Sequence, residues 1–381
     1  MHWNCFRCRF SSLSYRWVLP TLLLTLVTGT SCDRTGVLTL GTGPDGDRII
    51  SLAGISGDGS VIVGTIPFID EKRDSGLSFA QETQAFRWTA GGGIEPLGFI
   101  GPADFNESVA GAISANGRVI LGYSSSPEGN QSFRWTRLGG FAPLETPSDS
   151  INFAAATGLS SDGSVIIGRA MTKSPSRFMA FRWTERDGYQ FFNVPSLEKE
   201  SAWATDISND GRVIVGLVSM AGDRTFRWTA ETGAVVLDDF TENCGSTPFD
   251  ISGDGSTIIG QLCRNSNDPA PFRWTEAEGF VTLGGLPGER ESGSARATSY
   301  NGSVIVGTTR INERDSTAFI WDAVNGMRTI LSLLSEEDLA LLEGWSLESA
   351  DLLSADGRTV AGLGRNPEGN RDIWVVRLPL F

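Results

Sequence analysis

The chain has 381 residues and only one histidine, His2, which precedes an apolar run near the N-terminus. If that segment is removed on export, the mature chain has no histidine at all. Catalysis by Ser-His-Asp or Cys-His arrangements and metal binding through imidazole are then excluded. Carboxylates, tyrosine and arginine remain. A histidine-free carbohydrate-active enzyme, a glycosidase or a lyase working through carboxylates, therefore stays open.

Basic side chains are outnumbered. The chain carries 31 Lys and Arg against 45 Asp and Glu, a formal net charge of −14, and lysine occurs only at Lys72, Lys173 and Lys199. Proteins bind nucleic acids mainly by neutralising phosphates with cations. We therefore expect no nucleic-acid partner.

Residues 1–31 have the composition of a secretory signal: arginines, then an apolar run over residues 17–27, then small residues. The apolar run is too short for a comfortable membrane span. We predict export to the periplasm, the outer membrane or the extracellular space. Cys32 follows the small residues and is a candidate for lipidation, the one membrane attachment we expect, with plain cleavage nearby as the alternative.

Cysteine is sparse, with five residues. Cys5 and Cys8 fall within the predicted signal. Cys244 and Cys263 flank one turn of the repeat described next, and an exported protein permits a disulfide between them. Two buried free thiols are the alternative.

A repeat fills residues 33–381, which we predict to form a single domain. A phrase of the type Ile-Ser-x-Asp-Gly-Ser-Val-Ile-Val-Gly recurs seven times at intervals of 44 to 58 residues, each time followed by a phrase of the type Phe-Arg-Trp-Thr that ends, in the last repeat, at Trp374. Such a period is typical of blades or arrays. The central turn residues are Asp58, Gly59, Asn116, Gly117, Asp162, Gly163, Asp210, Gly211, Asp254, Gly255, Asn301, Gly302, Asp356 and Gly357.

Asp-Gly between β-branched runs predicts a two-residue hairpin. Asn116 and Asn301 replace the aspartate in two repeats, which indicates a turn requirement and not a catalytic carboxylate. The uninterrupted apolar triplets that follow, such as residues 61–63, indicate strands buried on both faces. Four strands in each of seven repeats predict an all-β, seven-bladed β-propeller. A β-solenoid is the main alternative.

The two ends of the repeat region predict ring closure. Residues 37–41 are an isolated copy of the fourth strand of a repeat, and the last repeat lacks its own fourth strand. An N-terminal strand that completes the last blade would leave no open edge. We expect a monomer.

The motifs resemble those of the HAF-repeat family of predicted exported bacterial proteins. Ala-Phe-Arg-Trp at residues 85–88 and 180–183 matches the family pattern fully, and the C-terminal unit with Trp345 and Trp374 looks like the family's usual last repeat. The resemblance covers about nine tenths of the chain. It implies a β-propeller-like repeat protein but carries over no reaction and no functional residue.

Metal chemistry has little support in the sequence. Asp45 and Asp47, like the Asp-Gly turns, suggest calcium, but a Ca²⁺ ion needs six to eight converging oxygens and no loop of that spacing is present. We predict no cofactor, with a calcium ion bridging blades as the alternative.

Two insertions interrupt the regular loops: residues 65–84, and residues 331–349, where Ser335 is predicted to cap a short helix that runs through Leu342. Ring closure makes their blades neighbours, and binding sites concentrate on variable loops of rigid scaffolds. Shielding of the central channel is the alternative role. The predicted binding residues are Asp70, Glu71, Lys72, Arg73, Phe79, Glu82, Glu336, Glu337, Asp338 and Trp345.

The sequence thus predicts a non-enzymatic exported propeller that binds a protein or a glycan at the bacterial cell envelope. The histidine-free carbohydrate-active enzyme and a purely structural envelope protein are the alternatives.

Overall fold

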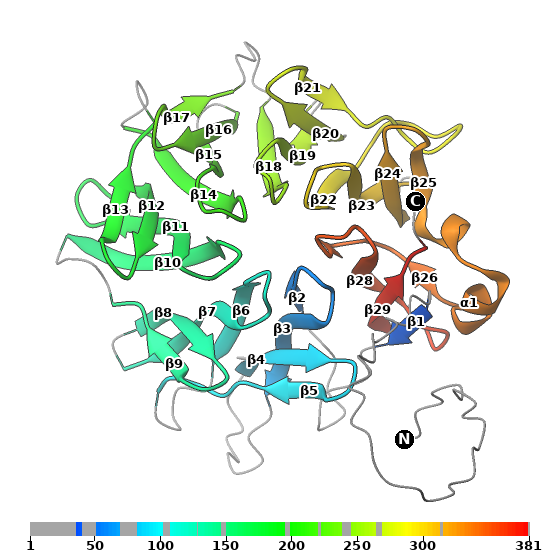
Figure 1. Ribbon diagram of the computed structural model, residues 1–381, viewed down its shortest axis with the longest axis horizontal. Helices are drawn as coiled ribbons and strands as arrows, with labels where there is room; N and C mark the ends of the chain where they lie inside the picture. The colour runs from blue at the N-terminus through cyan, green and yellow to red at the C-terminus, as the bar shows by residue number, and fades with distance from the viewer. Residues whose placement is uncertain are drawn as a thin grey trace, which may run out of the picture. The chain divides into compact units, whose positions relative to one another are not determined.

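The structure is a computed structural model that describes residues 36–39, 51–68, 82–101, 107–127, 129–145, 150–194, 199–219, 222–237, 245–263, 269–312 and 315–379. The chain divides after Asp33, and all described residues belong to the unit that spans 34–381. This unit is a seven-bladed β-propeller, as predicted (Figure 1).

Six blades are four-stranded antiparallel sheets whose strands follow chain order from the innermost to the outermost. Blades 1 to 3 contain β2 (Ser51–Ile55), β3 (Val61–Phe68), β4 (Glu82–Thr89) and β5 (Gly93–Pro96); β6 (Ser108–Ile113), β7 (Val119–Ser126), β8 (Gly129–Thr136) and β9 (Gly140–Pro143); and β10 (Ile151–Leu159), β11 (Val165–Thr172), β12 (Phe178–Thr184) and β13 (Gly188–Phe192). Blades 4 to 6 contain β14 (Ser201–Ile207), β15 (Ile214–Ser219), β16 (Arg224–Thr229) and β17 (Gly233–Val236); β18 (Ser246–Ile251), β19 (Thr257–Leu262), β20 (Ala270–Thr275) and β21 (Gly279–Thr282); and β22 (Ser294–Thr298), β23 (Val304–Arg310), β24 (Ser316–Asp322) and β25 (Gly326–Thr329).

Blade 7 closes the ring in the predicted way. Its inner strand is split into β26 (Ser346–Leu347) and β27 (Leu352–Leu353), followed by β28 (Thr359–Arg365) and β29 (Arg371–Arg377). The N-terminal strand β1 (Gly36–Thr39) pairs antiparallel with β29, so both ends of the propeller share one sheet. A 3-10 helix (Ile330–Leu333) and helix α1 (Glu336–Leu341) lie between blades 6 and 7, and Figure 1 shows α1 at the outer rim, where it contacts β1.

A glycine beneath an aromatic ring is the packing unit of each blade. Gly168 of β11 lies opposite Phe181 of β12, and a Cβ on Gly168 would come within 2.7 Å of the ring. The ring therefore occupies the space that a side chain on the glycine would take. Phenylalanines at this position in blades 1 to 6 are fully buried: Phe86, Phe133, Phe181, Phe226, Phe272 and Phe319.

Blade 7 corrects the predicted alignment of the repeats. Trp374 lies opposite Gly362, so it occupies the phenylalanine position and not the tryptophan position of the repeat. Val376 stands where the other blades have tryptophan. The indole is fully buried, and its Nε1 donates to the carbonyl oxygen of Leu363 at 3.0 Å. The tryptophans of the other blades are buried or partly buried, as expected of core residues.

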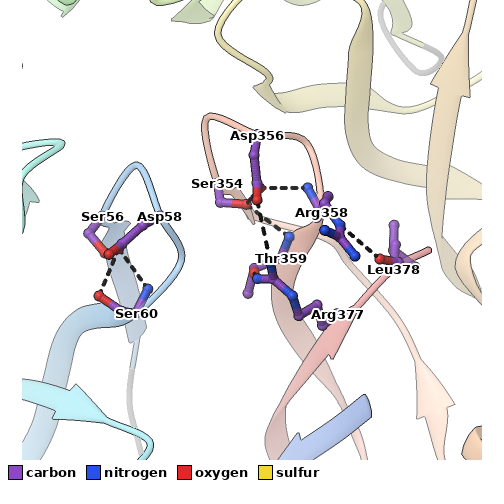
Figure 2. Close-up of polar contacts among 9 residues, drawn as sticks. All are labelled: Ser56, Asp58, Ser60, Ser354, Asp356, Arg358, Thr359, Arg377 and Leu378. Atoms are coloured by element: carbon purple, nitrogen blue, oxygen red, sulfur yellow. Dashed lines mark hydrogen bonds and ion pairs between the residues drawn. The ribbon is translucent and has the colours of Figure 1, made fainter. Parts of the chain in front are cut away.

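The Asp-Gly turns also differ from the expected hairpin. In blade 1 the N–H of Gly59 donates to the carbonyl oxygen of Ser56 at 2.9 Å, so the turn spans residues 56–59. Asp58 and Gly59 are therefore its third and fourth residues and not the two central residues that the sequence predicts. Gly59 carries the positive φ, 71°, which favours glycine. Oδ1 of Asp58 accepts from the hydroxyls of Ser56 and Ser60 and from the N–H of Ser60 (Figure 2).

This use of one oxygen explains why Asp and Asn interchange. Oδ1 of Asn116 accepts from the hydroxyl of Ser114 and the N–H of Arg118, and Oδ1 of Asn301 makes the corresponding bonds with Ser299 and Ser303. An amide oxygen meets the same demand as a carboxylate oxygen. Either residue can therefore hold the turn in its conformation.

The turns of all seven blades are joined in a circle by backbone hydrogen bonds. Each blade donates to the next, and the circle closes where blade 7 donates to blade 1. The bonds run from Gly57 N to Ala115 O (2.8 Å), Asn116 N to Ser161 O (3.4 Å), Ser161 N to Asn209 O (3.0 Å), Asn209 N to Gly253 O (2.9 Å), Asp254 N to Tyr300 O (2.9 Å), Tyr300 N to Ala355 O (2.9 Å) and Ala355 N to Gly57 O (3.0 Å).

Candidate functional site

The inner strands of all seven blades line a cavity of about 550 Å³ at the centre of the propeller. This volume lies within the range of about 300–1,000 Å³ that is common for small-molecule sites. Figure 1 shows β2, β6, β10, β14, β18 and β22 around this centre. Because each blade contributes one strand, a residue's place along the repeat decides whether it can reach the cavity.

A β-bulge recurs in the inner strands and brings one residue per blade to the cavity wall. In blade 2, for example, the pairing of β6 with β7 skips Gly111 between Ala110 and Ala112. Bulges re-aim side chains and are common near functional sites. The bulge residues, with Asp351 at the same place in the split strand of blade 7, are here called the bulge ring: Ala53, Gly111, Thr157, Thr205, Phe249, Arg296 and Asp351.

A second set of seven residues lies four positions further along, at the hydrogen-bonded circle of turns. These residues also line the cavity and are here called the turn ring: Gly57, Ala115, Ser161, Asn209, Gly253, Tyr300 and Ala355. Gly253 is overlaid by its neighbours, since a Cβ there would lie 2.5 Å from the ring of Tyr300 and 2.8 Å from the amide of Asn209.

The two rings make the cavity asymmetric. Among the described residues of the two rings, blades 1 to 3 contribute only glycine, alanine, serine and threonine. The large side chains all come from blades 4 to 7: Asn209, Phe249, Arg296, Tyr300 and Asp351. Where the seven repeats carry the same residue, the fold of each blade explains that residue. The ring positions vary between blades, so the fold does not require the large polar and aromatic groups found there.

Two carboxyl groups meet on the same wall of the cavity. Asp206 of β14 and Asp250 of β18 follow the bulge residues of neighbouring blades, and their side chains are hydrogen-bonded to each other. Oδ2 of Asp206 accepts from the N–H of Ile251 at 2.9 Å, and Oδ2 of Asp250 accepts from the N–H of Thr298 at 2.7 Å. The pair thus links the inner strands of blades 4, 5 and 6.

This contact requires a shared proton. Removal from water raises the pKa of Asp206, and removal from water together with the charge of Asp206 raises the pKa of Asp250 well above its ordinary value. Two carboxylates in contact cannot both stay ionised without a large penalty, and one proton between them removes it.

Arg296 is the single basic residue among the described residues that line the cavity. Its side chain is exposed, and its guanidinium carbon lies 4.5 Å from the centre of the Phe249 ring in the neighbouring blade. No carboxylate forms an ion pair with it among the described residues. On the next blade, Oδ2 of Asp351 accepts from the hydroxyl of Ser349 at 2.6 Å.

The predicted insertions are only partly described, and their binding role stays a prediction. Asp70, Glu71, Lys72, Arg73 and Phe79 lie outside the described residues. Glu82 does not lie in a loop, because β3 and β4 continue to the pair Phe68 and Glu82. The insertion is therefore shorter than the expected twenty residues.

The second insertion contains the predicted helix. Ser335 caps α1: its hydroxyl accepts from the N–H of Asp338 at 3.1 Å and donates to Oδ2 of Asp338 at 2.7 Å. Asp338 is buried by this role, whereas Glu336 and Glu337 are exposed. Trp345 is partly buried against the core between blades 6 and 7. Since α1 lies at the outer rim, it does not shield the cavity (Figure 1).

Of the cysteines predicted to form a disulfide or to carry a lipid, the structure describes only Cys263. Cys263 is disulfide-bonded, and its N–H donates to the carbonyl oxygen of Gly245 at 2.9 Å. Its predicted partner Cys244, and the lipidation candidate Cys32, lie outside the described residues. In the described part of the chain, no three His, Cys, Asp or Glu side chains are grouped so that they could hold a metal ion. Nor does any described helix have the length and apolar character needed to cross a membrane.

No family model matches the chain, and no curated protein matches it. Solved propellers do match. An oligogalacturonate lyase in complex with manganese superposes with a TM-score of 0.56 at 13% identity, covering 90% of this chain and 93% of the lyase. An oligogalacturonate lyase from Vibrio parahaemolyticus gives 0.58 at 9% identity, covering 91% and 97%. A prolyl endopeptidase structure gives 0.56 at 10% identity and covers 90% of this chain but 51% of that enzyme.

This chain shares the β-propeller fold with these lyases. At such low identities the likeness shows the fold alone. The resemblance to HAF-repeat proteins stays a prediction.

Proposed function

We propose that the protein is a non-enzymatic binding module that takes a glycan into its central cavity, at the bacterial cell envelope to which its predicted signal directs it. The observation that carries this proposal is the asymmetry of the two rings. Large polar and aromatic side chains of the two rings come from blades 4 to 7, whereas the described ring residues of blades 1 to 3 are small. Aromatic faces with a few convergent polar groups are typical of small-ligand sites.

A glycan suits this cavity better than a protein partner. Stable protein interfaces bury about 800 Å² on each partner, which requires a broad surface. A recess of about 550 Å³ with hydroxyl, amide, guanidinium and carboxylate groups on its wall suits a few sugar units instead.

The carboxyl pair favours a second candidate, the histidine-free carbohydrate-active enzyme, because a carboxyl group with a raised pKa can act as a general acid. Its geometry argues against a two-carboxylate glycosidase. Such enzymes hold their carboxyl groups about 5–5.5 Å or about 6.5–9.5 Å apart on either side of the bond that they cleave. Asp206 and Asp250 touch each other and accept backbone N–H groups.

The test is a glycan panel, neutral and acidic, measured against the intact mature chain by calorimetry. Gly111→Phe should block the cavity without disturbing the blade, because the nearest atom to a Cβ there is 3.8 Å away. Gly91→Phe is the matched control, with nothing within 4 Å of its Cβ and no contact with the cavity. We expect the first variant to abolish binding and the second to retain it.

Two results would reject the proposal: no glycan binds, or both variants bind as the unaltered chain does. Cleavage of a bound glycan that Asp206→Asn abolishes would establish the enzymatic candidate instead.

A further inference from the structure

Arg296 has no acidic partner among the described residues, whereas some other arginines of the blades form ion pairs. Arg87 pairs with Glu95 at 3.7 Å, and Arg273 pairs with Glu278 at 2.6 Å. A shortage of acids cannot explain the difference, since the chain carries 45 Asp and Glu against 31 Lys and Arg. Within the described residues, Arg296 contacts an aromatic ring and forms no ion pair.

The acids that share its cavity are held by other groups. Asp206 and Asp250 bind each other and the backbone N–H groups of Ile251 and Thr298. Asp351 accepts from the hydroxyl of Ser349. Among the described residues, therefore, no acid of the cavity wall forms an ion pair with the guanidinium of Arg296.

Stacking prepares this guanidinium for an anion. Its carbon lies 4.5 Å from the centre of the Phe249 ring, so the cation is positioned by contact with an aromatic face. The N–H groups of a guanidinium lie in its own plane and match the two oxygens of a carboxylate. Arg296 comes from a bulge, which fixes its Cα on the cavity wall.

Neutral polar groups line the same cavity. Thr205 and Asn209 line the cavity from blade 4, and Tyr300 from blade 6 is half-exposed, with 50% of its surface accessible. Hydroxyl, amide and phenol groups bind sugar hydroxyls, and the Tyr300 ring offers a face for a sugar ring. We infer that the cavity binds an acidic sugar, a hexuronic acid or a short chain that contains one, with its carboxylate on Arg296. This inference rests on the proposed function and names the ligand class for the same cavity.

The experiment compares glucuronic, galacturonic and mannuronic acids, each with its neutral hexose, by saturation-transfer NMR and titration against the mature chain. We expect at least one acid to bind 10-fold or more tightly than its hexose and to weaken as salt is added. Arg296→Gln should remove this preference. Arg296→Lys keeps the charge but loses the planar fork, so it should retain only part of the preference.

The control is Arg186→Gln, since the side chain of Arg186 is 93% exposed and does not line the cavity. Thermal melts of each variant show whether the fold is kept, and Arg296→Lys still tests the inference if Arg296→Gln fails to fold. Equal binding of acids and hexoses, unchanged by either Arg296 variant, would overturn the inference and leave the proposed function standing. Failure of every sugar in the wider glycan panel would reject both.

Discussion

The carboxyl groups of Asp206 and Asp250 are hydrogen-bonded to each other across two neighbouring blades, at equivalent positions of the repeat. In the other blades this position holds glycine, alanine or leucine: Gly54, Ala112, Gly158, Ala297 and Leu352. Asp206 also binds the N–H of Ile251 in blade 5, and Asp250 binds the N–H of Thr298 in blade 6. The pair therefore stabilises a junction that the rest of the ring builds without carboxyl groups.

The pair makes stability depend on pH above the ordinary carboxyl pKa. Because the pKa of each group is raised in the folded state, the folded chain holds a proton that the unfolded chain has lost. Stability should therefore fall as the pH rises from about 4 through the raised pKa of the pair. Asp250→Asn keeps an oxygen for Thr298 and offers N–H groups to Asp206, so we expect a flatter profile between pH 5 and 9.

Melting temperatures across this range check the prediction, with a gain of about 1 kcal/mol or more at pH 8 expected for Asp250→Asn. Asp254→Asn is the control. It removes a carboxylate from the same blade at a turn position where two other blades already carry asparagine. Equal slopes in both variants would mean that the pair does not share a proton.

The turn aspartates should act at the acid side. Hydrogen bonds from the N–H and the hydroxyl of Ser164, and from the hydroxyl of Ser160, lower the pKa of Asp162. Its contribution is therefore complete above the ordinary carboxyl pKa and is lost as the pH falls through the lowered value. Asp162→Asn keeps an oxygen for the three hydrogen bonds but loses the charge, so it should lower stability slightly at pH 7 and flatten the profile below pH 4.

Asp162→Ala removes all three bonds and should cost about 1 kcal/mol at pH 7. Urea denaturation of both variants provides the measurement. An alanine variant as stable as the asparagine variant would show that the side-chain oxygen is unimportant.

The glycine beneath each aromatic ring should tolerate no side chain. A Cβ on Gly168 would lie 2.0 Å from the carbonyl oxygen of Ala155 and 2.7 Å from the ring of Phe181. Backbone and ring must both move, so Gly168→Ala should cost about 3 kcal/mol or more. Gly91→Ala, with open space around its Cβ, should change the free energy of unfolding by less than about 0.5 kcal/mol.

Denaturant midpoints compare the two variants directly. If Gly168→Ala were as stable as Gly91→Ala, the close approach of strand and ring would not be a requirement of the blade.

The blade architecture could be predicted because its demands repeat seven times. Turn glycines, buried triplets and aromatic strands recur in register, and each copy reinforces the others. The alignment was wrong in blade 7, where Ile373 and Trp374 look like the Arg-Trp of the other repeats. The pairing of Trp374 with Gly362 decides the register, and sequence spacing alone does not show which residue faces the glycine.

The cavity residues were missed for a different reason. Phe249, Arg296 and Asp351 lie one to a blade, about 50 residues apart, and only the packing of neighbouring blades around one centre brings them to one wall. The sequence prediction placed the binding site on the two insertions instead, because they are the longest variable loops. The sequence nevertheless contains a signal for these residues. When the repeats are aligned on the turn glycine, the positions five and six residues earlier hold small residues in blades 1 to 3 but include larger or charged residues in blades 4 to 7.

The closure of blade 7 by β1 can be tested by removing a few residues from the N-terminus. Residues 36–39 pair with β29 from Arg377 to Trp374, and without them β29 becomes an open edge. A chain that begins at residue 40 should therefore melt several degrees lower and associate as its concentration rises. A chain that begins at residue 34, at the unit boundary, is the control and should behave as the longer protein does.

A peptide of residues 34–41 should restore the melting temperature of the shortened chain, whereas a scrambled peptide should not. Equal melting of the two truncated chains would mean that β29 needs no partner and that the circle of turn hydrogen bonds, closed between Ala355 and Gly57, holds the ring by itself.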